Sequence, residues 1–151
     1  MKLEFMEEAI KMAKKSGKDI PVGAVIVKDG EIISSAHNTV IESRDATAHA
    51  EVNAIRKACQ ILNTHDLSGC ILYTSCEPCP MCLSAIIWAN IKEVYYANSR
   101  DDADEIGFRD DMIHEFIKGN NNSLIKMNHI ENSDAIDVFN EFKELENKEM
   151  Y

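Results

Sequence analysis

Apolar positions near the start of the chain recur at helical spacing and then change to the continuous pattern of a strand. Residues 3–16 place apolar side chains every three to four positions between charged ones, which predicts an amphipathic helix. Residues 22–27 form an unbroken apolar run, typical of a strand that is covered on both faces. Asp29-Gly30 is a strong two-residue turn signal, and residues 31–36 are the expected partner strand. The sequence therefore opens with a helix and a β-hairpin.

Two helices alternate with two strands in the middle of the chain. Residues 49–62 carry apolar side chains on one helical face, and Thr47 is the candidate N-cap. Residues 70–74 form a short strand of the buried type, and a second helix is predicted over residues 79–90. Residues 93–97 are the next strand. The order β-β-α-β-α-β after the first helix indicates an α/β sandwich with both parallel and antiparallel strand pairs.

The pattern weakens in the C-terminal third of the chain. Residues 109–117 have helical periodicity, and residues 123–129 predict a last strand. A terminal helix is predicted from Ser133, which is its candidate cap. The positions of this helix that should face inward are Ile136, Phe139 and Phe142. No linker or low-complexity tract divides the chain, so we expect a single domain over residues 1–151.

Composition and charge narrow the class of protein. The 151 residues carry a net charge of −10 at pH 7 with scattered basic residues, which disfavours nucleic acid as the main ligand and favours a small molecule. No run of about 18 apolar residues is present, so we expect neither a membrane span nor a secretory signal. Five cysteines are an odd number, which argues against a disulfide framework and favours the reducing cytoplasm.

The candidate chemistry lies in Cys76-Glu77-Pro78-Cys79-Pro80-Met81-Cys82 and in His49-Ala50-Glu51. Cys79 and Cys82 fit the first turn of a helix with both sulfurs on one side. The helix N-terminus favours anions, so it lowers the thiol pKa values and makes the thiolates better metal ligands. His49 adds an imidazole. Two cysteines and one histidine, with a fourth position left to water, are the composition of a catalytic zinc site.

Glu51 completes the chemistry without binding the metal. His49 and Glu51 are two residues apart, about 200° of helix rotation, so they converge only at a point just beyond the helix end. Zinc lowers the pKa of its bound water, and a neighbouring carboxylate can relay the proton to a ring nitrogen and a leaving amine. The outcome is hydrolytic deamination of an amidine-like carbon. The spacing H-x-E…P-C-x-x-C is the signature of zinc base deaminases.

The flanks of these motifs narrow the class further. The strings TAHAEVNAIRKACQIL and CILYTSCEPCPMCLSAIIWA resemble the bacterial guanine deaminases of the cytidine-deaminase-like superfamily, as do residues 103–108 and the C-terminal Tyr151. The resemblance implies a three-layer α/β/α sandwich with a mixed five-stranded sheet and one zinc per chain. It also implies conversion of guanine to xanthine and ammonia in purine catabolism.

The same resemblance implies roles for residues by position. It implies the zinc ligands His49, Cys79 and Cys82, the catalytic residues Glu51 and Asp110, and the substrate-binding residues Asn38, Ala50 and Tyr151. Asp110 would hold or protonate the leaving amino group, and Asn38 would hydrogen-bond the base. The relatives are homodimers in which the C-terminal segment crosses to the partner, which here corresponds to about residues 130–151.

Alternatives remain open at three positions. Pro21-Val22-Gly23 resembles the tRNA adenosine deaminases, which favours an adenosine in tRNA or another nucleobase or nucleoside as substrate. Asp111 competes with Asp110 for the acidic position after Gly107-Phe108. Cys76 would make a closed site with four protein ligands if it also bound the metal, and the protein would then be a metal-stabilised binding module. We expect Cys76 to be a packing residue at a strand end.

Overall fold

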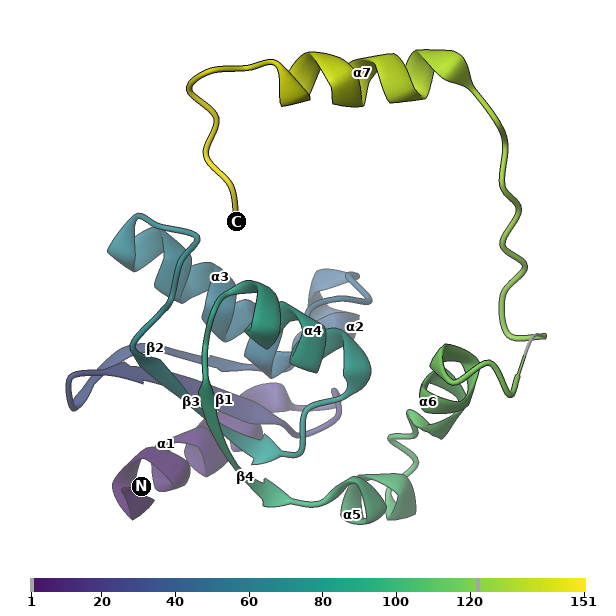
Figure 1. Ribbon diagram of the computed structural model, residues 1–151. Helices are drawn as coiled ribbons and strands as arrows, with labels where there is room; N and C mark the ends of the chain where they lie inside the picture. Colours follow the sequence, from purple (N-terminus) through teal and green to yellow (C-terminus); the bar gives the residue numbers. More distant parts are fainter. Residues whose placement is uncertain (1, 122) are drawn as a thin grey trace.

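A mixed four-stranded sheet lies at the centre of the fold in the computed structural model, which describes residues 2–121 and 123–151 (Figure 1). Its strands are β1 (Gly23–Lys28), β2 (Glu31–His37), β3 (Cys70–Cys76) and β4 (Glu93–Asn98). The strand order is β2-β1-β3-β4. Strand β1 pairs antiparallel with β2 and β3, and β3 pairs parallel with β4. The predicted mixed sheet is confirmed, with four strands in place of the expected five.

The predicted hairpin connects β1 and β2. Asp29 and Gly30 have positive φ angles of 51° and 78°, the backbone of a two-residue turn whose twist matches that of the strands. Lys28 pairs with Glu31 directly across the turn. The pairing of β1 with β2 shifts by one residue between Ile26 and Val27, so the hairpin carries a bulge near its turn.

Helices cover both faces of the sheet, which confirms the three-layer sandwich. Helix α1 (Leu3–Ala13), with the 3₁₀ turn η1 (Lys14–Ser16), lies on one face, and α3 (Ala50–Leu62) and α4 (Pro80–Trp88) lie on the other (Figure 1). The short helix α2 (Val40–Ser43) precedes α3. Helix α3 begins later than predicted, because its N-cap is His49, while the hydroxyl of Thr47 donates to Asp45 Oδ1.

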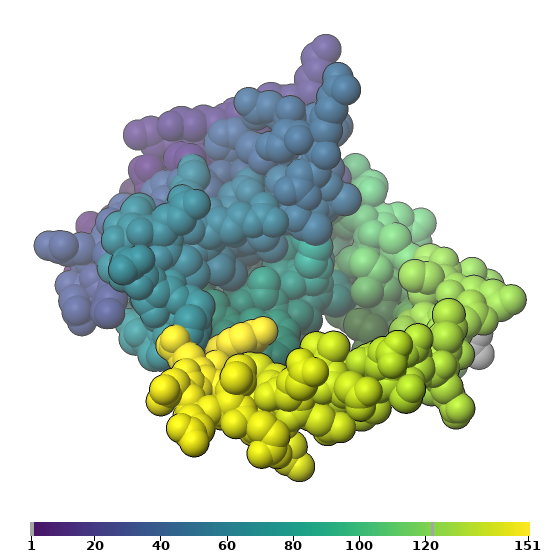
Figure 2. Space-filling model, turned by 90° about the horizontal axis from the view of Figure 1, so that it is seen from above, coloured from purple at the N-terminus to yellow at the C-terminus, as the bar shows by residue number. Residues whose placement is uncertain are grey.

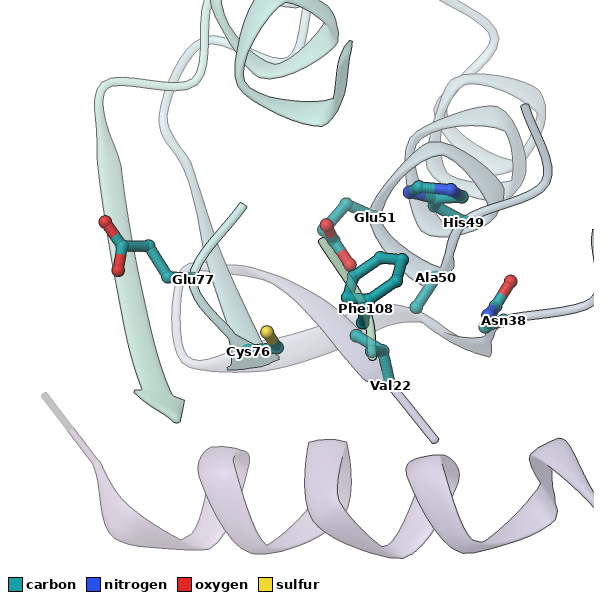
Figure 3. A pocket seen from close by; sticks show the side chains of 8 residues that line it. All are labelled: Val22, Asn38, His49, Ala50, Glu51, Cys76, Glu77 and Phe108. Carbon is teal, nitrogen blue, oxygen red and sulfur yellow. The ribbon is translucent and has the colours of Figure 1, made fainter. Parts of the chain in front are cut away.

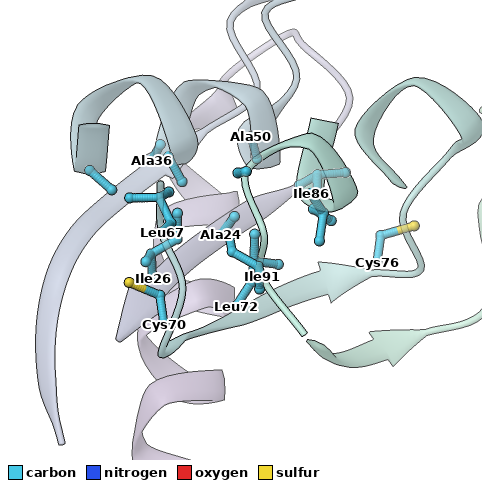
Figure 4. Packing of buried hydrophobic residues seen from close by; sticks show 14 of the residues in the cluster. Ala24, Ile26, Ala36, Ala50, Leu67, Cys70, Leu72, Cys76, Ile86 and Ile91 are labelled. Atoms are coloured by element: carbon cyan, nitrogen blue, oxygen red, sulfur yellow. The ribbon is translucent and has the colours of Figure 1, made fainter. Parts of the chain in front are cut away.

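The core divides into two clusters because β1 is buried on both faces. Ala24 and Ile26 pack in the cluster under α3 and α4, which Figure 4 shows, whereas Val25 and Val27 pack with Phe5 on the α1 side. Successive side chains of a strand point to opposite faces, so an unbroken apolar run is what a strand between two helical layers requires. Fully burying Ile26 is worth about 2–3 kcal/mol.

The C-terminal third follows the sandwich as separate helices. They are α5 (Arg100–Glu105), α6 (Asp111–Ile117) and α7 (Ser133–Lys143). The predicted strand over residues 123–129 was wrong, since these described residues form no strand and are exposed away from the sheet. Figure 1 shows α7 standing apart from the sheet, and Figure 2 shows the C-terminal segment as a band along one face.

Helix α7 buries none of its described residues. Phe139, Phe142 and Ile136 are exposed, so the prediction that they face the chain's own core was wrong. The amphipathic pattern predicted the helix correctly, but the apolar face has no cover within the described chain. No helix among residues 2–121 and 123–151 is both long and apolar enough to cross a membrane.

Candidate active site

Two helix N-termini meet at one edge of the sheet. Strands β2 and β3 both run antiparallel to β1 and therefore point the same way. Helix α3 follows β2 and α4 follows β3, so both helices begin at the carboxyl edge of their strands. His49 is the N-cap residue of α3 and Cys79 is the N-cap residue of α4, both with extended backbone. Pro80 at the first position of α4 favours this start.

The three predicted metal ligands converge at this edge. His49 Nδ1 lies 3.6 Å from Cys79 Sγ and 3.5 Å from Cys82 Sγ. The three ligand atoms all lie within 4.8 Å of one another. A tetrahedral zinc with bonds of about 2.3 Å to sulfur and about 2.0 Å to nitrogen holds those two atoms about 3.5 Å apart. The donor set therefore fits zinc, and Cys76 and Glu51 are not members of this group in the described chain.

The pKa values of the two thiols, Cys79 and Cys82, are shifted in opposite directions. Hydrogen bonds from the Cys82 thiol and from His49 lower the pKa of Cys79 to about 4, although burial opposes them. The thiol of Cys82 donates to Cys79, which together with burial raises the pKa of Cys82. The hydrogen bond to Cys79 also raises the pKa of His49. A thiolate is the form that binds metal, and the lowered pKa of Cys79 favours the thiolate at this ligand.

Glu51 is a buried carboxyl in the first turn of α3. Its side chain is 4% exposed, and burial is the main cause that raises its pKa. The hydroxyl of Thr74, on β3, donates to Glu51 Oε1 at 3.4 Å. A buried carboxyl with a raised pKa, held beside a metal site, has the properties of a proton relay.

A small cavity opens beside this carboxyl (Figure 3). The residues that line it are Val22, Asn38, His49, Ala50, Glu51, Cys76, Glu77 and Phe108. Two of the expected substrate-binding residues, Asn38 and Ala50, therefore lie in its wall. The amide of Asn38 is partly used by the fold, since Nδ2 donates to Ile20 O at 3.0 Å and Oδ1 accepts from the Val40 N–H at 3.3 Å.

Asp110 does not line this cavity but a separate hollow, together with Asp104, Arg109 and Asp111. The pKa of Cys76, in the cavity wall, is raised to about 12, chiefly by burial and then by the charges of Glu51, Glu77 and Asp110. Asp111 instead points to the solvent, where its carboxylate pairs with Arg109 at 3.4 Å. Of the two acids left open by the sequence, Asp110 is the more buried, and the role of either acid stays a prediction.

Tyr151 lies outside the cavity of its own chain. Its ring packs against those of Trp88 and His65, each with centroids 5.9 Å away. The role expected for Tyr151 concerns a partner chain and stays a prediction.

Sequence reasoning missed Phe108 as part of the site itself. The Phe108 ring lies 5.5 Å from the His49 ring and lines both the cavity and a second hollow at Lys18 and Ile20. An aromatic residue directly after Gly107 in a loop was the available signal. Cys76 is the last residue of β3 and is buried, as expected of a packing residue at a strand end.

A His/Cys/Cys metal group at two helix N-termini, with a buried glutamate beside it on an α/β/α sandwich, defines a zinc-dependent hydrolytic deaminase. Comparison with known proteins agrees. The model of the cytidine and deoxycytidylate deaminase zinc-binding region matches residues 1–98, and the chain belongs to this family.

Matches to individual proteins are more specific than the match to the family. The chain is 46% identical to guanine deaminase from Bacillus subtilis over an alignment of 151 positions, which covers 97% of each protein. The crystal structure of that enzyme superimposes with a TM-score of 0.93 at 45% identity and covers 100% of this chain and 99% of its own. A tRNA-specific adenosine deaminase from Aquifex aeolicus is 50% identical over 95 residues, which are 62% of this chain and 63% of that protein.

Proposed function

We propose that this zinc deaminase converts guanine to xanthine and ammonia. The observation that carries the proposal is the match to a guanine deaminase over 97% of both chains, the C-terminal third included. The tRNA adenosine deaminase match covers only 62% of the chain. The net charge of −10 also favours a small base over a tRNA backbone.

The residues of the site divide the chemistry between them. His49, Cys79 and Cys82 would hold the zinc, which would activate water as the nucleophile. Glu51 would take a proton from the attacking water and pass it to the ring nitrogen and the departing amino group. Burial keeps this carboxyl from solvent, so the proton stays between Glu51 and the substrate.

Asn38 and Ala50 are the residues that would bind the purine base. Asn38 keeps one N–H and one carbonyl lone pair beyond its structural bonds, enough to meet the edge of a purine. Ala50 begins α3, where the first backbone N–H groups have no intrahelical acceptor and can donate to a carbonyl oxygen. Asp110 faces the departing amino group.

We propose that the protein acts in the cytoplasm as a homodimer in which residues 130–151 cross to the partner and Tyr151 helps to close its site. All five cysteines lie in the described part of the chain and are free thiols, which suits a reducing compartment. The occupant that fits α7 is a second copy of this chain, because α4 carries an exposed apolar face of its own. Its exposed residues are Leu83, Ile87 and Trp88.

Purified zinc-loaded protein should release one ammonia per guanine consumed, with xanthine as the product. Adenine, cytosine and guanosine are the comparison substrates. Turnover of one of these without turnover of guanine would contradict guanine as the substrate, but the protein would still be a deaminase.

Light scattering tests the proposed dimer. Phe139→Ser should shift the protein from dimer to monomer, whereas Asp137→Ser on the same helix should not. A monomeric wild-type protein would contradict the exchange of segments.

A further inference from the structure

The carboxylate of Asp110 does not cap the helix that it begins. Asp110 is the N-cap residue of α6, a position where aspartate usually accepts a hydrogen bond from the backbone of the first turn. In the described structure its side chain makes no such bond. Asp110 Oδ2 instead lies 3.3 Å from Nε2 of His114, one helical turn further on. A carboxylate only accepts, so the imidazole N–H of His114 is the donor.

The second oxygen of this carboxylate is buried and unused. Among the described residues Asp110 Oδ1 has no hydrogen-bond partner, and buried polar atoms in that condition are rare enough to require an explanation. Phe108, two residues before Asp110, lines the cavity, so the loop that carries Asp110 forms part of the cavity wall, although Asp110 itself lines a separate hollow with Asp104 and Asp111. A substrate group entering the cavity is a partner that Oδ1 lacks.

The nearest cation does not hold Asp110 in this orientation. Arg109 is engaged by Asp104 at 2.8 Å and by Asp111 at 3.4 Å. His114 is therefore the group that contacts the Asp110 carboxylate, and the side chains of the two are 29% and 16% exposed. This partial burial limits competition from water for their hydrogen bond.

We propose that His114 is a positioning residue for Asp110 in the deamination. By holding Oδ2 it keeps the carboxylate from turning back to cap α6 and leaves Oδ1 free for the amino group that leaves the purine. The inference rests on the proposed function, since it assigns to Asp110 the substrate-facing role described above. It adds a residue to the site that has no motif of its own in the sequence.

The test compares variants that differ in whether residue 114 can donate to Asp110. His114→Leu removes the donor and should lower kcat about tenfold, the worth of one hydrogen bond to a charged group, with KM changed less than about twofold. His114→Gln places an amide N–H at a similar reach and should restore most of kcat. His114→Asn has the same chemistry but is too short, so it should behave like His114→Leu. Glu115→Gln, next on α6, is the control that should leave kcat unchanged.

A double-mutant cycle separates positioning from a structural role. In an Asp110→Asn background His114→Leu should cause no further loss of kcat, because the group that it positions is already gone. Equal losses in both backgrounds, or no rescue by His114→Gln, would overturn the proposal. Circular dichroism and zinc content must match the wild type in every variant compared.

A readout without turnover separates this inference from the proposed function. Histidine ¹⁵N spectra should show a proton on His114 Nε2, with a resonance that shifts in Asp110→Asn. An unshifted resonance would overturn the pairing even if guanine is a substrate. If the resonance shifts but the protein does not deaminate guanine, the Asp110–His114 contact would be supported and the proposed function would be wrong.

Discussion

Replacing Gly23 by alanine should push α1 off the sheet. Gly23 is the first residue of β1, and a Cβ atom added there would lie 1.9 Å from Ala9 O, 2.5 Å from Ala13 N and 2.9 Å from Met12 Cβ. Two of these atoms belong to the backbone of α1, so no side-chain rotation relieves the contact. Bringing the first distance to the 3.0 Å at which real Cβ contacts begin requires a local shift of at least 1.1 Å.

The cost of this shift is a large fraction of the stability of the fold. Overpacking a core usually costs about 1–3 kcal/mol, and a contact with helix backbone belongs at the upper end, about 3 kcal/mol. Net stabilities are about 5–15 kcal/mol. For a chain of this length about 3 kcal/mol lowers the Tm by about 6–12 °C. The site should suffer too, because the Gly23 N–H donates to Ser75 Oγ at 3.0 Å and Val22 lines the cavity.

Urea unfolding followed by circular dichroism measures the effect on Gly23→Ala. Lys28→Ala, at the other end of the same strand and only half-buried, is the matched control and should change the free energy of unfolding by less than about 0.5 kcal/mol. A Gly23→Ala protein as stable as this control would refute the reasoning, since α1 could not then be pressed against the strand.

Three further substitutions test the site. Glu51→Gln should keep the zinc and the fold while lowering kcat about 10²–10⁴-fold, and loss of metal in this variant would show that Glu51 is a ligand. Cys76→Ser should retain one zinc per chain by metal analysis, whereas metal loss with unfolding would favour a closed site with four protein ligands. Phe108→Ala should raise the KM for guanine by joining the cavity to the adjacent hollow, and an unchanged KM would remove Phe108 from the substrate wall.

The metal site could be predicted from sequence because its geometry is encoded locally. A proline after Cys79 and a polar loop before His49 mark two helix starts, and the strand order places both starts at one edge of the sheet. The same local signals predicted the hairpin and the two-sided burial of β1. In each case the residues that carry the signal are close in sequence to the structure they specify.

In the C-terminal third, local sequence signals predict a helix but not how it packs. Periodicity predicted α7 correctly, because a helical pattern reports which positions share a face. It does not report what covers that face, and the apolar side of α7 lies away from the core of its own chain. Residues 123–129 were assigned to a strand for the same reason, although they form no strand in the structure.

Asp110 and Asp111 show that the sequence also does not predict the contacts of a single side chain. Both are adjacent acids at a helix start, where local rules give each of them a solvated or capping role. Contacts with different neighbours distinguish them, because Asp111 pairs with Arg109 at 3.4 Å whereas Asp110 accepts from His114 at 3.3 Å. The unused cap of α6 is the observation on which we base the proposal that His114 positions the Asp110 carboxylate.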